Sequence, residues 1–196
     1  ISEDGTPFGE EYTLVAVADY VLSVKPGNTV SNLSSTRALA DVTRKAGGEY
    51  FAAAVGEVNV VTQMKAVNAI IGGEGNGGVI FPESHYGRDS LVGIGLFLTH
   101  LANKGIKASE LRASYPAYVI SKNKIELSAD LNVDLILATV AEKYKNEQVN
   151  TIDGVKIDFP DRWVHLRKSN TEPIIRIYAE ASSEAEADTL AQQIID

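Results

Sequence analysis

The sequence predicts an α/β domain with a mixed, mostly parallel sheet, followed by a small α+β domain with an antiparallel sheet and two helices. In the first half, helical and extended apolar patterns alternate, which is typical of parallel strands joined by helices. In the second half, several extended segments follow one another and are flanked by two helical segments, which favours an antiparallel sheet. The pattern changes within residues 106–116, so we expect domains of residues 1–108 and 109–196.

Capping residues and glycines mark the ends of the predicted elements in the first domain. We expect Ser35 to cap the start of the second helix and Gly47 to cap its end. The last helix should begin at Asp89 or Ser90 and end at Gly105. In chain order, the predicted helices are 9–27, 35–48, 58–68 (a short helix or a turn) and 88–105, and the predicted strands are 28–34, 49–55 and 69–78, the last running into a glycine-rich loop.

The second domain is organised around one strong turn signal. Asp153-Gly154 predicts a tight hairpin turn, because these residues reach positive φ at low cost. We expect Ser182 or Ser183 to cap the closing helix. The predicted elements are a strand at 117–127, an amphipathic helix at 128–146, a hairpin at 151–160, strands at 161–169 and 173–181, and a helix at 182–196.

Composition and charge exclude several classes of function. The 196 residues carry 26 acidic and 18 basic side chains, a net charge of −8, which argues against nucleic acid as a partner. There is no cysteine, so disulfides, thiolate catalysis and cysteine-based zinc sites are excluded. No apolar run approaches the ~20 residues of a membrane span, so we expect no membrane partner. These features are compatible with the cytoplasm, where we expect the protein to act.

The stretch "RKSNTEPIIR", residues 167–176, has the groups that a phosphate monoester needs. Two arginines, Arg167 and Arg176, flank Ser169, Asn170 and Thr171 in a loop between two predicted strands. Guanidinium groups grip phosphate through paired hydrogen bonds, and hydroxyl, amide and loop N–H groups add donors without any metal. The alternative is a polar turn with solvated arginines.

A second loop, "GGEGNGG" at residues 72–78, follows a buried strand. Glycines let the backbone approach a ligand closely, and Glu74 could accept hydrogen bonds from a pair of sugar hydroxyls. The alternative is a flexible turn in which Glu74 caps a helix. The loop has no lysine, so it is a poor nucleotide-phosphate cradle. The three histidines are too scattered for a metal site, and no Ser-His-Asp set is present. We therefore assign no catalytic and no metal-binding residue, although binding groups are present.

These two loops resemble those of the α-D-phosphohexomutase family, which includes phosphoglucomutases, phosphomannomutases and phosphoglucosamine mutases. "RKSNTEP" with the following Arg176 is similar to the phosphate-binding loop of the family's fourth domain. "GGEGNGG" is similar to the sugar-binding loop of its third domain, whose usual form is Gly-Glu-x-Ser-Gly-His. The opening "SEDGTPFGEE" resembles the segment after the family's metal-binding loop. Its "EDG", residues 3–5, resembles a hairpin turn, and only Ile1 and Ser2 remain of the strand that should precede it. We therefore expect a fragment of a longer protein.

The resemblance implies an enzyme of four domains, of which this chain holds the third and fourth. It implies a reversible shift of phosphate between C1 and C6 of a hexose. The phosphoserine and the Mg²⁺ ligands would belong to the missing N-terminal half, and the fragment itself would be inactive. The implied roles are phosphate binding by Arg167, Ser169, Asn170, Thr171 and Arg176, and sugar binding by Glu74 and Asn76.

The chain departs from the family pattern at several positions. Asn76 stands where many members have serine, and Gly78 where the mannose/glucose branch has histidine. Ser34 replaces a lysine of that branch, and Glu57 another histidine. These departures favour glucosamine phosphate as the substrate, with mannose or glucose phosphate next. The competing hypothesis is a non-catalytic anion-binding or interaction module.

Overall fold

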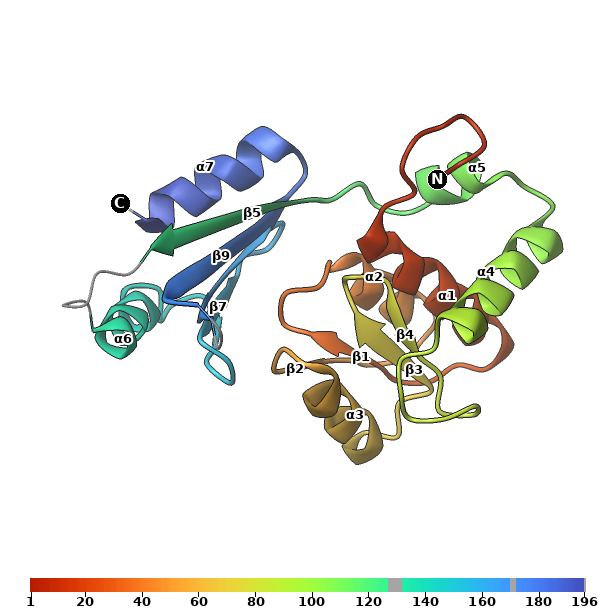
Figure 1. The fold of residues 1–196 in the computed structure, drawn as a ribbon, viewed down its shortest axis with the longest axis horizontal. Helices are drawn as coiled ribbons and strands as arrows, with labels where there is room; N and C mark the ends of the chain where they lie inside the picture. Colours follow the sequence, from red (N-terminus) through yellow and green to blue (C-terminus); the bar gives the residue numbers. More distant parts are fainter. Residues whose placement is uncertain (127–131, 170–171, 196) are drawn as a thin grey trace. The chain divides into compact units, whose positions relative to one another are not determined.

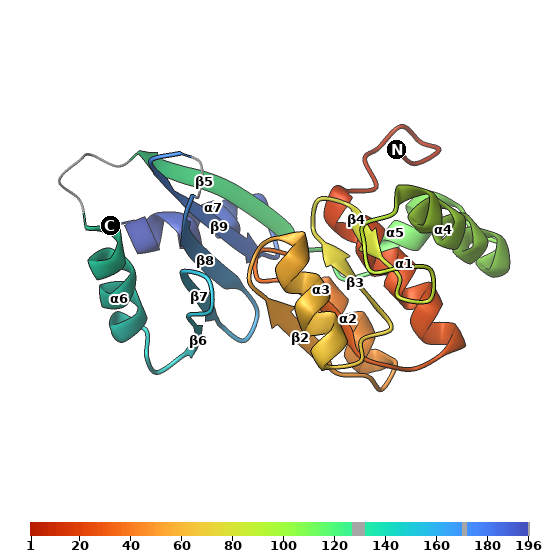
Figure 2. The ribbon, with the colours of Figure 1, turned by 60° about the horizontal axis from the view of Figure 1, so that its bottom comes forward.

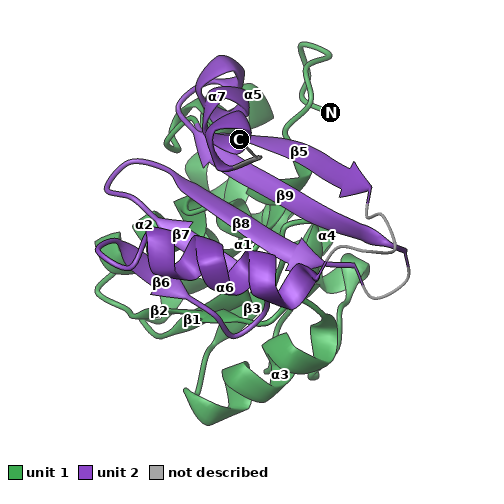
Figure 3. Cartoon of the chain, turned by 90° about the vertical axis from the view of Figure 1, so that its left-hand side faces the viewer, with its two compact units in different colours: residues 1–117 green, residues 118–196 purple. Residues whose placement is uncertain are grey.

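The computed structural model describes residues 1–126, 132–169 and 172–195, and the chain divides into two compact units, Ile1–Ala117 and Tyr118–Asp196 (Figure 1, Figure 3). The division falls after Ala117, whereas the sequence placed it after residue 108. The reason is a short helix, α5 (Ala108–Ala113), that the sequence did not reveal. Its Leu111 is completely buried, and the Tyr12 hydroxyl donates a hydrogen bond to the carbonyl of Pro116 at 2.6 Å. These contacts attach the segment to the first unit.

The first unit contains a four-stranded sheet in the order β2-β1-β3-β4. β1 is parallel to β2 and β3, and β4 is antiparallel to β3, so the predicted mixed, mostly parallel sheet is confirmed. Helices cover both faces (Figure 2). On one face, Val30 of β1 packs with Val60 and Met64 of α3, and on the other the Thr29 and Thr43 hydroxyls join β1 to α2. The elements are α1 (Glu10–Val24), β1 (Thr29–Asn32), α2 (Ala38–Lys45), β2 (Tyr50–Ala53), α3 (Glu57–Ala66), β3 (Ile71–Glu74), β4 (Gly78–Ile80) and α4 (Ser90–Lys104).

The capping predictions for α4 are confirmed, and one of those for α2 is wrong. The Asp89 carboxylate accepts hydrogen bonds from the N–H groups of Leu91 and Val92, and Gly105 ends α4 with φ +63°. Gly47, at φ +80°, lies one residue after Ala46, the C-cap of α2. Ser35 does not cap α2, because that helix begins three residues later.

Ser35 instead connects the end of β1 to the glycine-rich loop. Its hydroxyl donates to Asn32 Oδ1 and accepts a hydrogen bond from the N–H of Gly75, both at 3.0 Å. A serine hydroxyl can make only a few hydrogen bonds, so one that bonds to a neighbouring turn is not available to cap a helix. The result is that Ser35 positions the loop carrying Glu74 and Asn76.

The second unit contains a five-stranded, wholly antiparallel sheet in the order β5-β9-β8-β7-β6, as predicted. The hairpin at Asp153-Gly154 is confirmed, since Gly154 has φ +71° in the turn between β6 and β7. Ser183 accepts a hydrogen bond from the N–H of Glu186 at the start of α7. Residues 127–131, where the predicted 128–146 helix starts, lie outside the described residues. The elements are β5 (Val119–Glu126), α6 (Val133–Lys143), β6 (Gln148–Asn150), β7 (Val155–Asp158), β8 (Trp163–Lys168), β9 (Ile174–Ala181) and α7 (Glu184–Ile195).

One face of this sheet carries the apolar cluster of the second unit. Leu166 and Ile177 are cross-strand partners in the apolar cluster, which also contains Val133 of α6 and Leu190 of α7. Side chains alternate between faces along a strand. The next row of the sheet, which includes Arg167, therefore points to the face opposite the two helices.

Within the described residues, no helix is both long enough and apolar enough to cross a membrane.

Candidate functional site

The glycine-rich loop is a tight turn between β3 and β4. A Cβ at Gly73 would lie 1.9 Å from the carbonyl oxygen of Gly78 on the opposite strand, so the backbones approach as only glycine permits. Gly77 adopts φ +85° in the turn. This close turn places Glu74 at the last position of β3 and Asn76 at the tip.

Glu74 is held on both sides of its carboxylate. Oε1 accepts a hydrogen bond from Asn32 Nδ2 at 3.0 Å, and Oε2 lies 3.4 Å from Nη1 of Arg88. The residue is only 6% exposed. The fold thus buries Glu74 and pairs it with a cation. Each oxygen retains acceptor capacity, since an ionised carboxylate has about four lone-pair sites.

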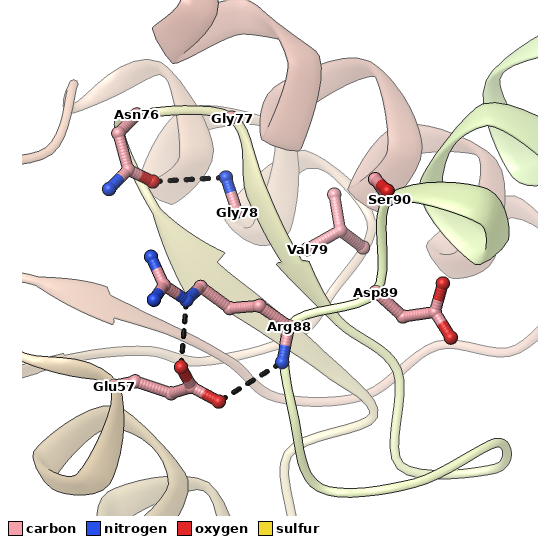
Figure 4. A pocket seen from close by; sticks show the side chains of 8 residues that line it. All are labelled: Glu57, Asn76, Gly77, Gly78, Val79, Arg88, Asp89 and Ser90. Atoms are coloured by element: carbon pink, nitrogen blue, oxygen red, sulfur yellow. Dashed lines mark hydrogen bonds and ion pairs between the residues drawn. The ribbon is translucent and has the colours of Figure 1, made fainter.

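A pocket of about 480 Å³ opens beside this turn (Figure 4). Asn76 lines it, and its Oδ1 accepts a hydrogen bond from the N–H of Gly78 at 3.1 Å, which fixes the orientation of the side chain. Glu74 is not among the lining residues. Those residues are Glu57, Asn76, Gly77, Gly78, Val79, Arg88, Asp89 and Ser90.

Arg88 is the principal side chain of this pocket, and the sequence did not identify it. Its Nε donates to Glu57 Oε2 at 2.7 Å, and its backbone N–H donates to Glu57 Oε1 at 3.1 Å. These two hydrogen bonds hold the pKa of Glu57 below its usual value. The carboxylate partner of Arg88, Glu57, is 31 positions away in the sequence.

One signal in the sequence could have identified this pair. In the mannose/glucose branch of the family that the sequence resembles, histidine is expected at the positions of Glu57 and Gly78, and Arg88 contacts both of these residues. A Cβ at Gly78 would lie 2.6 Å from Arg88 Cδ. The two departures from that pattern therefore lie on either side of one arginine.

The histidines are not brought together. Each contacts a partner of its own: His85 with Asp89, His100 with Asp19, and His165 with the carbonyl of Asp153. The pKa of Asp89 is lowered, mainly by a hydrogen bond from the N–H of Val92 and next by a hydrogen bond with His85. Across the described residues there is no group of three or more histidine, aspartate or glutamate side chains placed to hold a metal ion.

In the second unit, the two arginines of the 167–176 stretch lie directly opposite each other on adjacent strands. Arg167 of β8 pairs in register with Arg176 of β9, and Lys124 of β5 pairs with Arg176 from the other side. Cross-strand partners project from the same face of a sheet. Three cations therefore form one row across three strands; we call Lys124, Arg176 and Arg167 the cationic row.

Neighbouring groups neutralise only part of the positive charge of the cationic row. Arg176 Nη2 forms an ion pair with Glu172 at 2.9 Å, and a hydrogen bond with Tyr178 raises the pKa of Arg176. The Nε of Arg167 is buried and has no hydrogen-bond partner among the described residues. A buried donor without an acceptor costs free energy, so it indicates a missing partner.

The rest of the predicted loop is described in part. Ser169 is 6% exposed, and its N–H donates to the carbonyl of Ile174 at 3.0 Å, which closes the hairpin. That N–H is used within the protein, so it is not one of the loop donors that the sequence suggested. Asn170 and Thr171 lie outside the described residues.

Comparison with known proteins agrees with the fold. Residues 9–118 match the phosphoglucomutase/phosphomannomutase alpha/beta/alpha domain III, and residues 122–196 match the C-terminal domain of the same family. A phosphoglucomutase/phosphomannomutase of Thermococcus kodakarensis is 38% identical over 95% of this chain and 41% of its own length. A phosphoglucosamine/phosphogalactosamine mutase of Sulfurisphaera tokodaii is 40% identical over 71% of the chain and 31% of its own.

Solved structures give the same result for the fold. A phosphoglucomutase/phosphomannomutase family protein of Burkholderia thailandensis superimposes with a TM-score of 0.78 at 27% identity, over 96% of this chain and 41% of that one. The chain thus spans about two fifths of the length of the relatives it matches. With both of its units matched in order, the chain belongs to the phosphoglucomutase/phosphomannomutase family, of which it contains domain III and the C-terminal domain.

Proposed function

We propose that this chain is the substrate-binding half of a phosphohexomutase that interconverts hexose 1-phosphate and hexose 6-phosphate. Unit 1 binds sugar hydroxyls through Glu74 and Asn76. Unit 2 binds the phosphate that is not reacting, through Arg167, Arg176 and Ser169, together with Asn170 and Thr171. The membership in a family of mutases supports the reaction class. The protein is expected in the cytoplasm.

The observation that carries this proposal is the register of Arg167 and Arg176. Like charges directly opposite each other in a sheet are destabilising, and here a third cation, Lys124, extends the row. An arrangement that costs stability in the free protein is explained if an anion neutralises it. A phosphate monoester has the charge and the acceptor oxygens to satisfy both guanidinium groups, including the Nε of Arg167 that has no partner within the described residues.

Such an anchor suits a reaction in which the phosphate changes carbon atoms. The sugar must present C1 in one step and C6 in the other, so the phosphate that is not reacting sits on a different carbon each time. A pair of arginines recognises the phosphate group itself and is indifferent to the carbon that bears it. Phosphoryl transfer depends on positioning and charge stabilisation, which makes a fixed anchor valuable in both steps.

The remaining chemistry is assigned to the missing N-terminal half of the protein. The nucleophilic phosphoserine would lie there, and so would the ligands of Mg²⁺, which would supply charge stabilisation to the transferring phosphoryl group. The 196-residue chain alone should therefore catalyse no interconversion. Glucosamine phosphate is the first candidate substrate, and mannose or glucose phosphate comes next; the similarity to the Sulfurisphaera tokodaii protein supports an amino sugar.

An assay of the full-length protein that contains this chain tests the proposal. We expect it to interconvert glucosamine 1-phosphate and glucosamine 6-phosphate, and the 196-residue chain to give no turnover above a buffer blank. Substituting Arg167 or Arg176 should slow both directions, because both use the same anchor. If the full-length protein converts none of the glucosamine, mannose and glucose phosphates, the proposed function is wrong.

A further inference from the structure

We propose that Arg88 is a further sugar-binding residue of unit 1, fixed by Glu57 across Gly78, and that it donates hydrogen bonds to hydroxyl groups of the hexose. This inference rests on the proposed function and adds a residue to its sugar site. Figure 4 shows the guanidinium of Arg88 in the pocket, with Glu57 on one side and the turn of Asn76 on the other.

Arg88 is immobilised at two points before any ligand arrives. Glu57, the first residue of α3, accepts one hydrogen bond from the Arg88 side chain and one from its backbone. A long side chain normally loses rotamer freedom on binding, which weakens the affinity. Glu57 removes much of that cost in advance, so we assign Glu57 as a positioning residue.

Donor groups of Arg88 remain available after these contacts. A guanidinium has five N–H donors. Nε is used by Glu57, and Nη1 lies 3.4 Å from Glu74 Oε2, which is longer than a good charge-assisted hydrogen bond. Nη2 has no hydrogen-bond partner within the part of the chain that the structure describes, and the side chain is 45% exposed. These donors border the same pocket as Asn76.

The charges around the pocket select an uncharged partner for Arg88. Two carboxylates, Glu57 and Glu74, flank the single guanidinium, and Asp89 also lines the pocket, so the local charge is negative. A phosphate dianion would be repelled, whereas a sugar hydroxyl can accept from Arg88 and donate to Glu74 at no cost in charge. Arg88 and Glu74 together form a donor and an acceptor for neighbouring hydroxyls.

Gly78 makes this arrangement possible. A Cβ there would lie 2.6 Å from Arg88 Cδ and 3.0 Å from Asn76 Oδ1. Gly78→Ala would therefore move the Arg88 side chain without removing any hydrogen-bond donor or acceptor from the pocket. It tests the position of the arginine rather than its presence, because the nearest obstacle is a side chain and not the backbone.

The experiment is a titration of the ¹⁵N-labelled 196-residue chain followed by NMR, with glucosamine 6-phosphate and inorganic phosphate as separate probes. The amides of Asn76, Gly77 and Gly78 report on the sugar site. We expect Gly78→Ala and Arg88→Lys each to weaken the glucosamine 6-phosphate response of these amides by about 3- to 10-fold, the range for one hydrogen bond to a charged group. Inorganic phosphate should bind all variants equally. Gly95→Ala is the matched control, since no atom lies within 4 Å of its added Cβ.

Glu57→Gln tests the positioning role. It keeps the size and one acceptor oxygen, so it should weaken binding less than Arg88→Lys, and the double variant should be no weaker than Arg88→Lys alone. Additive losses would mean that the two residues act separately. If the amides respond to glucosamine 6-phosphate but Gly78→Ala and Arg88→Lys bind as the unmodified chain does, the assignment of Arg88 is wrong and the proposed function stands. If these amides do not respond in the unmodified chain, the sugar site itself is refuted.

Discussion

Arg167 on β8 and Arg176 on β9 lie directly opposite each other in the antiparallel register of the second sheet, and Lys124 on β5 lies opposite Arg176. Directly opposite side chains have Cβ atoms about 4.5–5.5 Å apart, so this row concentrates positive charge in a chain whose net charge is −8. The local field at the row is set by these three cations and by Glu172, which pairs with Arg176, because screening in physiological salt removes most influence beyond ~8 Å.

Substitution of Arg167 should weaken phosphate binding more than substitution of its neighbour Lys168. Both side chains are cationic, but they project from opposite faces of β8, and only Arg167 belongs to the cationic row. For the unmodified chain we expect millimolar affinity, ~4 kcal/mol. Arg167→Gln should reduce it by about tenfold or more.

Titration of inorganic phosphate followed by the Ser169 amide measures this affinity, and Lys168→Gln provides the control with an equal loss of charge. Arg167→Lys should also bind more weakly, because an ammonium cannot reproduce the forked grip of a guanidinium. Equal affinities for Arg167→Gln and Lys168→Gln would remove the anchor from this face of the sheet.

Lys124→Gln should have two effects of opposite sign. Relief of repulsion between Lys124 and Arg176 should stabilise the phosphate-free chain by a few tenths of a kcal/mol, the scale of a cross-strand pair. Loss of an exposed cation from the row should weaken phosphate binding by about twofold at low salt, and by less at high salt. Urea denaturation without phosphate measures the first effect and phosphate titration the second; the same sign for both would contradict a repulsive row.

The second unit should lose stability in acid through His165. Burial is the main reason that the pKa of His165 falls from 6.5 to about 4, and its ring lies 2.7 Å from the carbonyl of Asp153. The unfolded chain takes up this proton near pH 6.5 and the folded chain only near pH 4, so stability is complete above that window and declines as the pH falls through it. The full loss is at most about 3 kcal/mol.

Urea denaturation at a series of pH values compares the unmodified chain with His165→Gln. The amide nitrogen of glutamine can replace the donor to Asp153, but it does not titrate, so the variant should show a flatter profile between pH 6.5 and 4. Other titrating groups are shared by both proteins and cancel in the difference. Parallel profiles would exclude His165 as the cause.

Asp89→Ala should destabilise the first unit by about 1 kcal/mol, the usual effect of losing a helix cap. The Asp89 carboxylate accepts from two N–H groups at the start of α4, and an alanine side chain has no acceptor to replace it. Asp89→Asn retains the capping oxygen and should recover most of the loss. Thermal unfolding measures the stability of both variants. If Asp89→Ala is as stable as the unmodified chain, the cap does not stabilise the first unit.

Much of the fold was predictable because its signals are local. Periodic apolar residues and turn residues such as Asp153-Gly154 act within a few positions of themselves, and the elements they predicted were found. Ser35 was mispredicted because its competing partner, the N–H of Gly75, is 40 positions away. The short helix α5 was missed because it depends on the burial of Leu111 by the rest of the unit.

The same distinction between local and long-range contacts applies to the candidate sites. The sequence by itself determined that two arginines flank a polar loop and that a glycine-rich turn carries Glu74 and Asn76, because these groups are contiguous in the chain. Only the tertiary structure decided that Arg167 and Arg176 stand directly opposite each other, since a shift of one residue in register would have separated them. It alone joined Arg88 to Glu57 across 31 positions, because such a contact depends on how α3 and the β4–α4 segment pack, and no periodicity in the chain encodes it.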